Sequence, residues 1–260
     1  MSVWHDIHGE GPPVVLLHAG LADSRLWEPQ LRSFPRSHLV LRVDLPGFGN
    51  SPFETNPVSF GGAVRDAMDA VGIDRAALVG VSLGGNTALE LALDSPERIS
   101  ARVLVGAGLP DHEWSEQVIT FFTEEEAALE RGDLDAAVDA NLSTWLAGPH
   151  RKLKDIDPAI RERVDEMPRQ AFRQQKGHED VRVLRLDPPE SERLGELKVP
   201  TLVVTGEQDV GDIHEIADRL GREIAGARRA TIANTAHLPN LEQPDEFDRI
   251  VLGFLGKHGV

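Results

Sequence analysis

One serine in the chain is flanked by glycines at a spacing that exposes a nucleophilic hydroxyl. Residues 77–81 are apolar apart from Gly80, Ser82 follows, and residues 83–92 continue past Gly84 with helical spacing. This pattern predicts a strand, a sharp turn and a helix. A serine on so tight a turn has a strained backbone, and the glycines leave the space that a Cβ would fill. The sequence therefore predicts an exposed nucleophile, Ser82, at the end of a strand.

The same turn supplies a place for developing negative charge. The N–H of Leu83 opens the helix, so it has no partner within the helix and lies at the positive end of the helix dipole. It faces the point where an oxyanion forms when Ser82 attacks a carbonyl. A second donor is the N–H of Gly20, in the loop after the apolar run 14–17. The nearby His18 is interpreted as a structural histidine that bonds its own loop.

Two further residues that could take part in this chemistry follow predicted strands. Asp209 comes after the apolar run 201–205 and a turn, and His237 follows the strand candidate 227–232. In sheets built from alternating strands and helices, functional groups gather beyond the carboxyl ends of the strands. We therefore expect Asp209 and His237 to meet Ser82 at that edge. Their chain order, serine then acid then histidine, is typical of a nucleophile-elbow fold.

Composition limits the classes of function. A length of 260 residues suits one α/β domain with an insertion. A net charge of −16 argues against nucleic acid or an anionic membrane as partner, so a small-molecule substrate and a monomer or homodimer are expected. With no cysteine, the chemistry must come from hydroxyls, carboxylates, histidines and backbone amides, and no metal or cofactor is expected. The absence of signal-peptide and membrane-span patterns predicts a cytoplasmic location.

The order of the predicted elements divides the chain. A mostly parallel sheet flanked by helices is expected over 1–109 and 197–260, with a helical cap inserted at 110–196. Within the cap, 124–140 and 158–175 are amphipathic. Further helices are predicted over 25–34, 59–72, 213–220 and 244–255.

Large apolar side chains are concentrated in the predicted cap. They are Trp114, Phe121, Phe122, Trp145, Met167 and Phe172. Such residues usually pack where a cap meets its core, so we expect one or two of the six to line a pocket. The first four are the candidates to reach over Ser82.

Five motifs of this sequence resemble those of the α/β-hydrolase family, and the resemblance covers nearly the whole chain. They are the oxyanion loop Leu16-Leu17-His18-Ala19-Gly20, the loop Asp44-x-x-Gly47-x-Gly49-x-Ser51, the elbow Gly80 to Gly85, the acid turn Gly206-Glu207-x-Asp209, and the segment His237-x-x-x-x-Glu242-x-Pro244-x-x-Phe247. Ala19 stands where glycine is usual and Val81 where histidine is common, and the N-terminal hairpin is shortened to one strand.

The resemblance implies a role for each candidate residue. Ser82 would be the nucleophile, His237 the general base and then acid, and Asp209 the group that fixes the imidazole tautomer. The N–H groups of Leu83 and Gly20 would stabilise the oxyanion. Some relatives carry the acid after the preceding strand, where Asp111 stands, but Asp209 follows its own strand and turn more directly.

Several reactions on this fold remain open. Relatives that open epoxides or displace halide use aspartate at the position of Ser82, and carbon–carbon bond hydrolases often place tryptophan where Leu238 follows the histidine. A serine esterase or lactonase is the favoured function, ahead of a carbon–carbon bond hydrolase or a cofactor-free perhydrolase. A ligand receptor, or a pathway cyclase or thioesterase-like protein, is the alternative of a different class.

The acidic composition also predicts the character of the substrate. Few cationic residues stand near the catalytic loops, so neutral, apolar acyl groups of small to medium size are expected to be preferred over acyl groups that carry a carboxylate. Arg151, Lys152 and Lys154 would reverse this expectation if one of them pointed inward.

Overall fold

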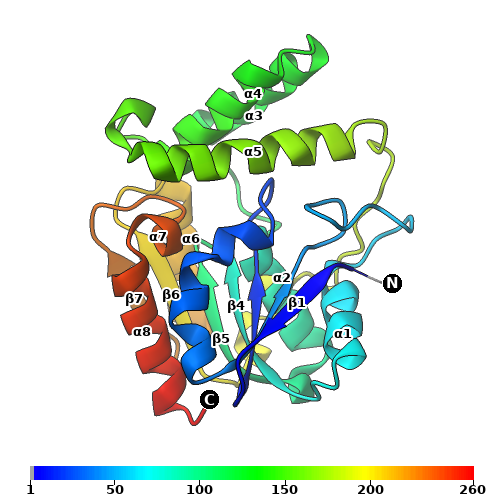
Figure 1. Cartoon of the computed structure of the whole chain (residues 1–260), viewed down its shortest axis with the longest axis vertical. Coiled ribbons are helices and arrows are strands. Elements are labelled where there is room, and N and C mark those ends of the chain that lie inside the picture. Colours follow the sequence, from blue (N-terminus) through cyan, green and yellow to red (C-terminus); the bar gives the residue numbers. More distant parts are fainter. Residues whose placement is uncertain (1–2) are drawn as a thin grey trace.

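Seven strands of the described chain form one sheet at the centre of the molecule (Figure 1). The computed structural model describes residues 3–260. Residues 1 and 2, which belong to the predicted core and to the N-terminal segment without a signal-peptide pattern, lie outside the described residues. The strands are β1 (His5–His8), β2 (Pro13–Leu17), β3 (Leu39–Val43), β4 (Ala76–Val81), β5 (Ile99–Val105), β6 (Thr201–Gly206) and β7 (Arg228–Ile232). Their order is β1-β3-β2-β4-β5-β6-β7, and only β1 pairs antiparallel to its neighbour. The predicted α/β architecture with a mostly parallel sheet is confirmed.

The helices flank the sheet and cross above one edge of it. They are α1 (Phe60–Ala70), α2 (Leu83–Asp94), α3 (Glu116–Glu130), α4 (Leu134–Asn141), α5 (Pro158–Gln175), α6 (Gly211–Glu223), α7 (Pro239–Glu242) and α8 (Pro244–Lys257). A turn of π-helix, Leu142–Ala147, follows α4 directly. Within residues 3–260, no helix has both the length and the apolar character that crossing a bilayer demands.

Both faces of the sheet are covered, which explains the continuous apolar runs. Val15 and Leu17 of β2 join a core cluster with α1, α2 and α6, whereas Val14 and Leu16 join one with α8. All four side chains are fully buried, and each such burial contributes roughly 1.5–3 kcal/mol. A strand buried on both faces needs apolar residues at every position, so the pattern of period two disappears.

Two helix predictions are wrong in detail. Residues 25–34 form successive 3₁₀ turns instead of a helix, because Pro29 and Pro35 have no N–H to donate within an α-helix. The amphipathic stretch 124–140 is broken between α3 and α4 at Gly132, whose φ of +74° ends α3 in the left-handed conformation. Asp133 then caps α4 by accepting a hydrogen bond from the backbone N–H three residues on.

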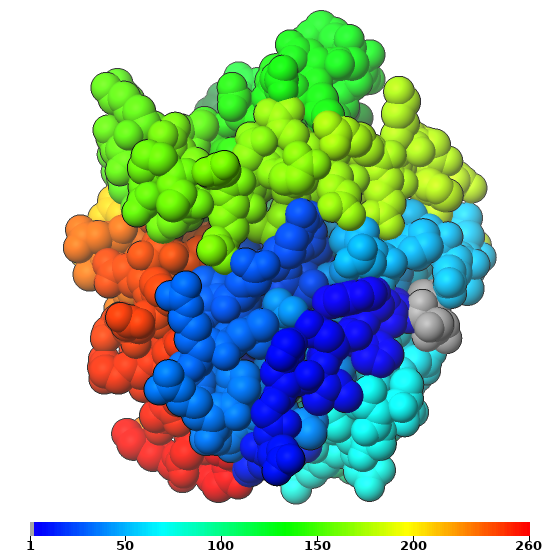
Figure 2. Space-filling view, viewed as in Figure 1, coloured from blue at the N-terminus to red at the C-terminus, as the bar shows by residue number. Residues whose placement is uncertain are grey.

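The segment between β5 and β6 covers the carboxyl edge of the sheet. Figure 2 shows its green and yellow-green residues spread over the top of the molecule, above the blue N-terminal residues. Three glutamine side chains of α5 donate hydrogen bonds to backbone carbonyls of the loop 47–51: Gln170 to Gly49, Gln174 to Ser51 and Gln175 to Gly47. These bonds fix α5 over the core, while the division into core and cap at residues 110 and 196 stays a prediction.

Glu90 is a buried carboxyl between α2 and α1. It is 6% exposed, and a Cβ on Gly61 would lie 3.0 Å from its Oε1. Burial, with a smaller contribution from the nearby charge of Glu190, raises the pKa of Glu90 to about 7. The folded protein therefore holds a proton on Glu90 that the unfolded chain releases near pH 4.5.

This raised pKa predicts a pH dependence of stability. The protonated carboxyl stabilises the fold fully below about pH 4.5, and this contribution is lost as the pH rises through 7. Glu90→Gln should thus match the native protein at pH 4 and exceed its free energy of unfolding by about 2 kcal/mol at pH 8. Urea denaturation across this range measures the difference, and the exposed Glu97→Gln is the control. A constant difference between Glu90→Gln and the native protein would contradict the prediction.

Candidate active site

Ser82 occupies the turn between β4 and α2 in a strained conformation. Its φ is 52° and its ψ is −110°, a region that costs a residue with a side chain about 1–3 kcal/mol. A Cβ on Gly80 would lie 2.2 Å from the carbonyl oxygen of Gly84, so glycine is required there. The backbone N–H of Ser82 donates to the Val105 carbonyl of β5 at 2.8 Å, which ties the turn to the neighbouring strand. The structure thus holds Ser82 at the carboxyl edge.

Asp209 and His237 form a buried hydrogen-bonded pair at the same edge. His237 Nδ1 lies 2.8 Å from Asp209 Oδ2, and each residue is 3% exposed. The other carboxylate oxygen accepts from the backbone N–H of Val210 at 2.9 Å. Because the carboxylate accepts, Nδ1 carries the proton and Nε2 is left as the basic nitrogen.

Two neighbours restrict the imidazole of His237. Gly106, with φ of +49°, leaves room for it, because a Cβ there would lie 3.0 Å from Nδ1. On another side the indole of Trp145 packs at a centroid distance of 4.6 Å, and the Trp145 carbonyl accepts the backbone N–H of His237 at 3.1 Å. The orientation of the imidazole therefore depends on both the sheet and the segment above it.

The two predicted oxyanion donors lie side by side. A Cβ on Gly20 would be 3.9 Å from the Cβ of Leu83, and both residues line the cavity that contains Ser82 and His237. Neither backbone N–H has an acceptor within residues 3–260. Within the same described residues, no hydrogen bond joins the Ser82 hydroxyl to His237. In serine hydrolases without substrate this contact is often long, and it shortens when substrate binds. The predicted site residues are thus gathered around one cavity.

The surrounding loop agrees with the structural interpretation of His18. Its Nε2 accepts from the backbone N–H of Leu45 at 2.9 Å, so its Nδ1 donates to the carbonyl of Ala19 at 2.7 Å. Complete burial lowers the pKa of His18, which favours the neutral ring that these two bonds require. His18 therefore holds the loop that presents Gly20.

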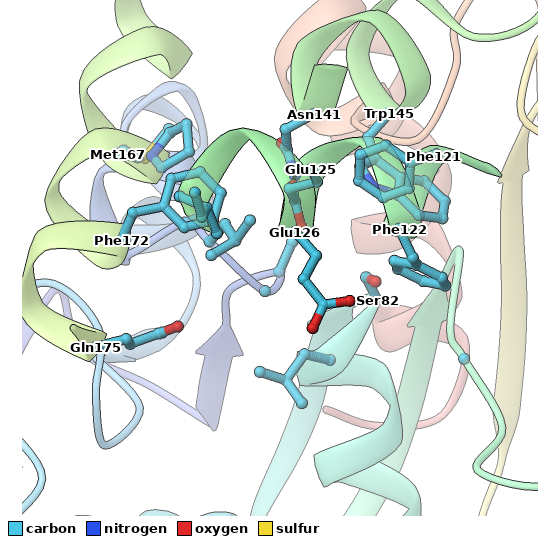
Figure 3. Close-up of a pocket in the computed structure, with 18 of the residues that line it drawn as sticks. Ser82, Phe121, Phe122, Glu125, Glu126, Asn141, Trp145, Met167, Phe172 and Gln175 are labelled. Atoms are coloured by element: carbon cyan, nitrogen blue, oxygen red, sulfur yellow. Dashed lines mark hydrogen bonds between the residues drawn. The ribbon is translucent and has the colours of Figure 1, made fainter. Parts of the chain in front are cut away.

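The cavity has a volume of about 1320 Å³ and is walled by the predicted cap aromatics. Figure 3 shows Phe121, Phe122 and Trp145 above Ser82, with Met167 and Phe172 on the opposite wall. Trp114 also lines the cavity, so all six large residues do, and the expectation of one or two is wrong. The reason is tertiary: α3 and α5 cross above the sheet edge, so their inner faces look onto a hollow rather than onto packed core.

The cations near this cavity are not those singled out in the sequence. Arg151 donates to the carbonyl oxygens of two cap residues and pairs with Glu242 at 2.6 Å, while Lys152 and Lys154 are exposed. None of the three lines the cavity. Arg151 instead ties the segment between β5 and β6 to the loop that carries His237, because Glu242 also accepts the backbone N–H of Ala236.

Several polar residues of the cavity wall escaped the sequence reasoning. They are Asn86, Glu125, Glu126, Glu130, Asn141, Arg173, Gln175, Lys176, His178, Glu179 and Arg185. Arg185 Nη1 donates to Asn86 Oδ1 at 3.1 Å, and Asn86 lies one helical turn after Ser82. Helical spacing is the signal that could have found part of this set, since Asn86 follows Ser82, and Glu125 follows Phe121, by four residues.

Comparison with known proteins agrees with this geometry. The α/β hydrolase fold family matches residues 12–244. The chain belongs to this family.

The chain is 29% identical to the pimeloyl-[acyl-carrier protein] methyl ester esterase of Aeromonas salmonicida, covering 98% of this chain and 100% of that protein. It is 28% identical to the 2-hydroxy-6-oxo-6-phenylhexa-2,4-dienoate hydrolase of Comamonas testosteroni, over 95% and 88% of the two chains. The enol-lactonase structure from Burkholderia xenovorans LB400 matches with a TM-score of 0.76 and 25% identity, over 98% and 96% of the chains. The predicted class, an α/β-fold hydrolase, is confirmed.

The position of the acid generates the first test of this site. Asp209 bonds His237, whereas Asp111 is exposed and pairs with Arg219 at 3.2 Å. Asp209→Asn should lower kcat by roughly 10⁴, because an amide stabilises the wrong imidazole tautomer. Asp111→Asn should leave kcat within about twofold, since exposed ion pairs contribute little. Steady-state hydrolysis of an aryl ester measures both, and the reverse pattern would move the acid to Asp111.

Proposed function

We propose that the protein is a serine hydrolase that cleaves a small to medium ester or lactone through an acyl-serine intermediate. One observation supports this most: His237, hydrogen-bonded to the buried Asp209, borders the same cavity as Ser82 on its strained turn. A serine is a poor nucleophile at neutral pH unless a base removes its proton. His237 could be such a base, because it borders the same cavity as Ser82.

The geometry supports a two-stage reaction. Nε2 of His237 takes the proton of Ser82 as the hydroxyl oxygen attacks the substrate carbonyl. The free N–H groups of Gly20 and Leu83 stabilise the oxyanion, and each such donor lowers the barrier by about 3 kcal/mol. His237 then protonates the departing alcohol, and afterwards it activates the water that releases the acid from Ser82. Asp209 holds the imidazole in the required tautomer throughout.

Ester or lactone cleavage is favoured over the other reactions by what the cavity contains. The named relatives span ester and carbon–carbon bond hydrolases, so their names leave the bond undecided. Leu238, which follows the histidine, is a wall residue of the cavity and offers only apolar contact. A receptor or other non-hydrolytic role would not require an oriented Asp209–His237 pair beside a serine that lines the cavity, and catalytic turnover separates the two classes.

Labelling tests the nucleophile directly. A fluorophosphonate should modify the protein once, at Ser82, and Ser82→Ala should lose both the label and the hydrolysis of p-nitrophenyl butyrate. The free energy of unfolding should change by less than about 1 kcal/mol, because the Ser82 hydroxyl makes no hydrogen bond that holds the fold among residues 3–260. Intact-protein mass spectrometry and peptide mapping locate the label. Labelling that persists in the alanine variant, or a single turnover without release of product, would refute the proposal.

The charge of the preferred acyl group is a second test. We propose that neutral acyl groups are favoured over those with a carboxylate, because the carboxyl of Glu125 lies in the wall and Arg151 is engaged outside the cavity. The kcat/KM of p-nitrophenyl esters of matched length should be at least about tenfold higher for alkyl than for carboxyalkyl chains. Arg173, Lys176 and Arg185 line the cavity and are the cations that could reverse this order. Arg185, whose Nη1 donates to Asn86 one helical turn after Ser82, is the first to replace. If carboxyalkyl esters win and Arg185→Gln removes their advantage, the neutral preference is wrong.

A further inference from the structure

Two layers of side chains cross the roof of the catalytic cavity. In the first, the rings of Phe121 and Trp145 meet edge to face at a centroid distance of 5.7 Å. In the second, Asn141 Nδ2 donates to Glu125 Oε1 at 3.1 Å. Phe121 and Glu125 are four residues apart on α3, and Asn141, the last residue of α4, lies four residues before Trp145 in the π-helical turn, so the two pairs run in opposite directions along the chain. The layers are therefore successive, separated by one helical turn of about 6 Å.

This spacing places Glu125 at a defined distance from the chemistry. The first layer contacts the catalytic imidazole, because Trp145 packs on His237. The second layer lies one turn further from His237 along the cavity wall. Figure 3 shows Glu125 beside Asn141 on the cap side, with Ser82 below them. A substrate bound at Ser82 would thus reach Glu125 with its far end rather than with its reacting carbonyl.

The carboxyl of Glu125 is incompletely satisfied. Its Oε1 accepts one hydrogen bond from a neutral amide, and within residues 3–260 its Oε2 accepts none and no cation pairs with it. Other carboxylates of the cap do find cations: Asp165 pairs with Arg169 at 2.6 Å, and Glu166 with Arg173 at 3.2 Å. Burial raises the pKa of Glu125 to about 7, against the smaller effect of Asn141. Glu125 is half-buried, and its Oε2 is not closed off from the cavity, so a bound ligand could supply a donor to it.

We propose that Glu125 binds a hydrogen-bond donor, a hydroxyl or an ammonium group, at the far end of an otherwise apolar substrate. Large apolar residues line the cavity with Glu125, among them Phe121, Trp145, Met167 and Phe172. Such walls accept a hydrocarbon chain, and their ring faces also attract a cation. A terminal carboxylate would face the Glu125 carboxyl without a donor to offer. This proposal rests on the proposed esterase function and specifies its substrate class.

The experiment compares matched esters in matched variants. Two series of esters are compared, each with a terminal methyl, hydroxyl or ammonium group and with several chain lengths. In one series the terminal group is on the acyl chain, and in the other it is on the alcohol. Glu125→Met removes the acceptor at nearly equal length, and Glu125→Gln keeps one acceptor oxygen but no charge. Glu124→Gln is the control, because Glu124 is an exposed carboxylate of the same helix outside this cavity.

In the native protein, kcat/KM for the esters with a terminal hydroxyl or ammonium group should each exceed that for the ester with a terminal methyl group at least about tenfold, at one chain length in one series. Glu125→Met should reverse this order, because an apolar wall favours the methyl group. Glu125→Gln should retain the hydroxyl preference within about threefold and lose the ammonium preference. Glu124→Gln should match the native protein in every ratio.

Three results would overturn the proposal. One is a native protein that prefers the esters with a terminal methyl group at every length in both series. Another is an unchanged hydroxyl-to-methyl ratio of kcat/KM in Glu125→Met. The third is loss of the preference in Glu126→Gln alone, which would show that the neighbouring carboxylate accepts the substrate's donor. Methyl-ester turnover and fluorophosphonate labelling report the serine chemistry separately. A protein that turns over methyl esters without the preference refutes only the role of Glu125, whereas one that shows neither turnover nor labelling refutes the esterase function and this proposal together.

Discussion

The close approach of α2 to the sheet is the constraint on which the rest of the site depends. A Cβ on Gly84 would lie 2.3 Å from the carbonyl oxygen of Leu17, and one on Gly80 would lie 2.2 Å from that of Gly84. Only glycines allow the helix to start this near to β2 and β4. The approach sets the strained backbone of Ser82 and places the free N–H of Leu83 beside Gly20. The positions of the candidate nucleophile and of the proposed oxyanion donors are therefore consequences of one packing contact.

The segment above the sheet completes the site rather than merely covering it. The Trp145 carbonyl accepts the backbone N–H of His237, and the Trp145 indole packs on the imidazole. A residue of the segment between β5 and β6 therefore helps to orient the His237 side chain. Arg151 binds the same histidine loop through Glu242. Orientation of the base and shape of the cavity are coupled, because the same short stretch of chain provides both.

The cavity combines apolar walls with a few polar groups at set depths. Ser82 and His237 lie at the sheet edge, an aromatic layer follows, and the pair of Glu125 and Asn141 lies one helical turn beyond. Apolar surface supplies most of the binding free energy of small ligands, while isolated polar groups fix their orientation.

The sequence by itself determined the parts that depend on local rules. Glycine spacing around Ser82, apolar runs for strands buried on both faces, and the order of Ser82, Asp209 and His237 predicted the fold, the family and the candidate site, because backbone sterics and the parallel sheet leave few alternatives. Only the tertiary structure decided which side chains face the hollow. It turned Arg151 toward Glu242, brought all the cap aromatics to the cavity wall and sheltered Glu125 beside Asn141. The physical reason is that an amphipathic pattern shows which face of a helix is buried, whereas the crossing of helices above the sheet edge decides whether that face meets packed core or an open cavity.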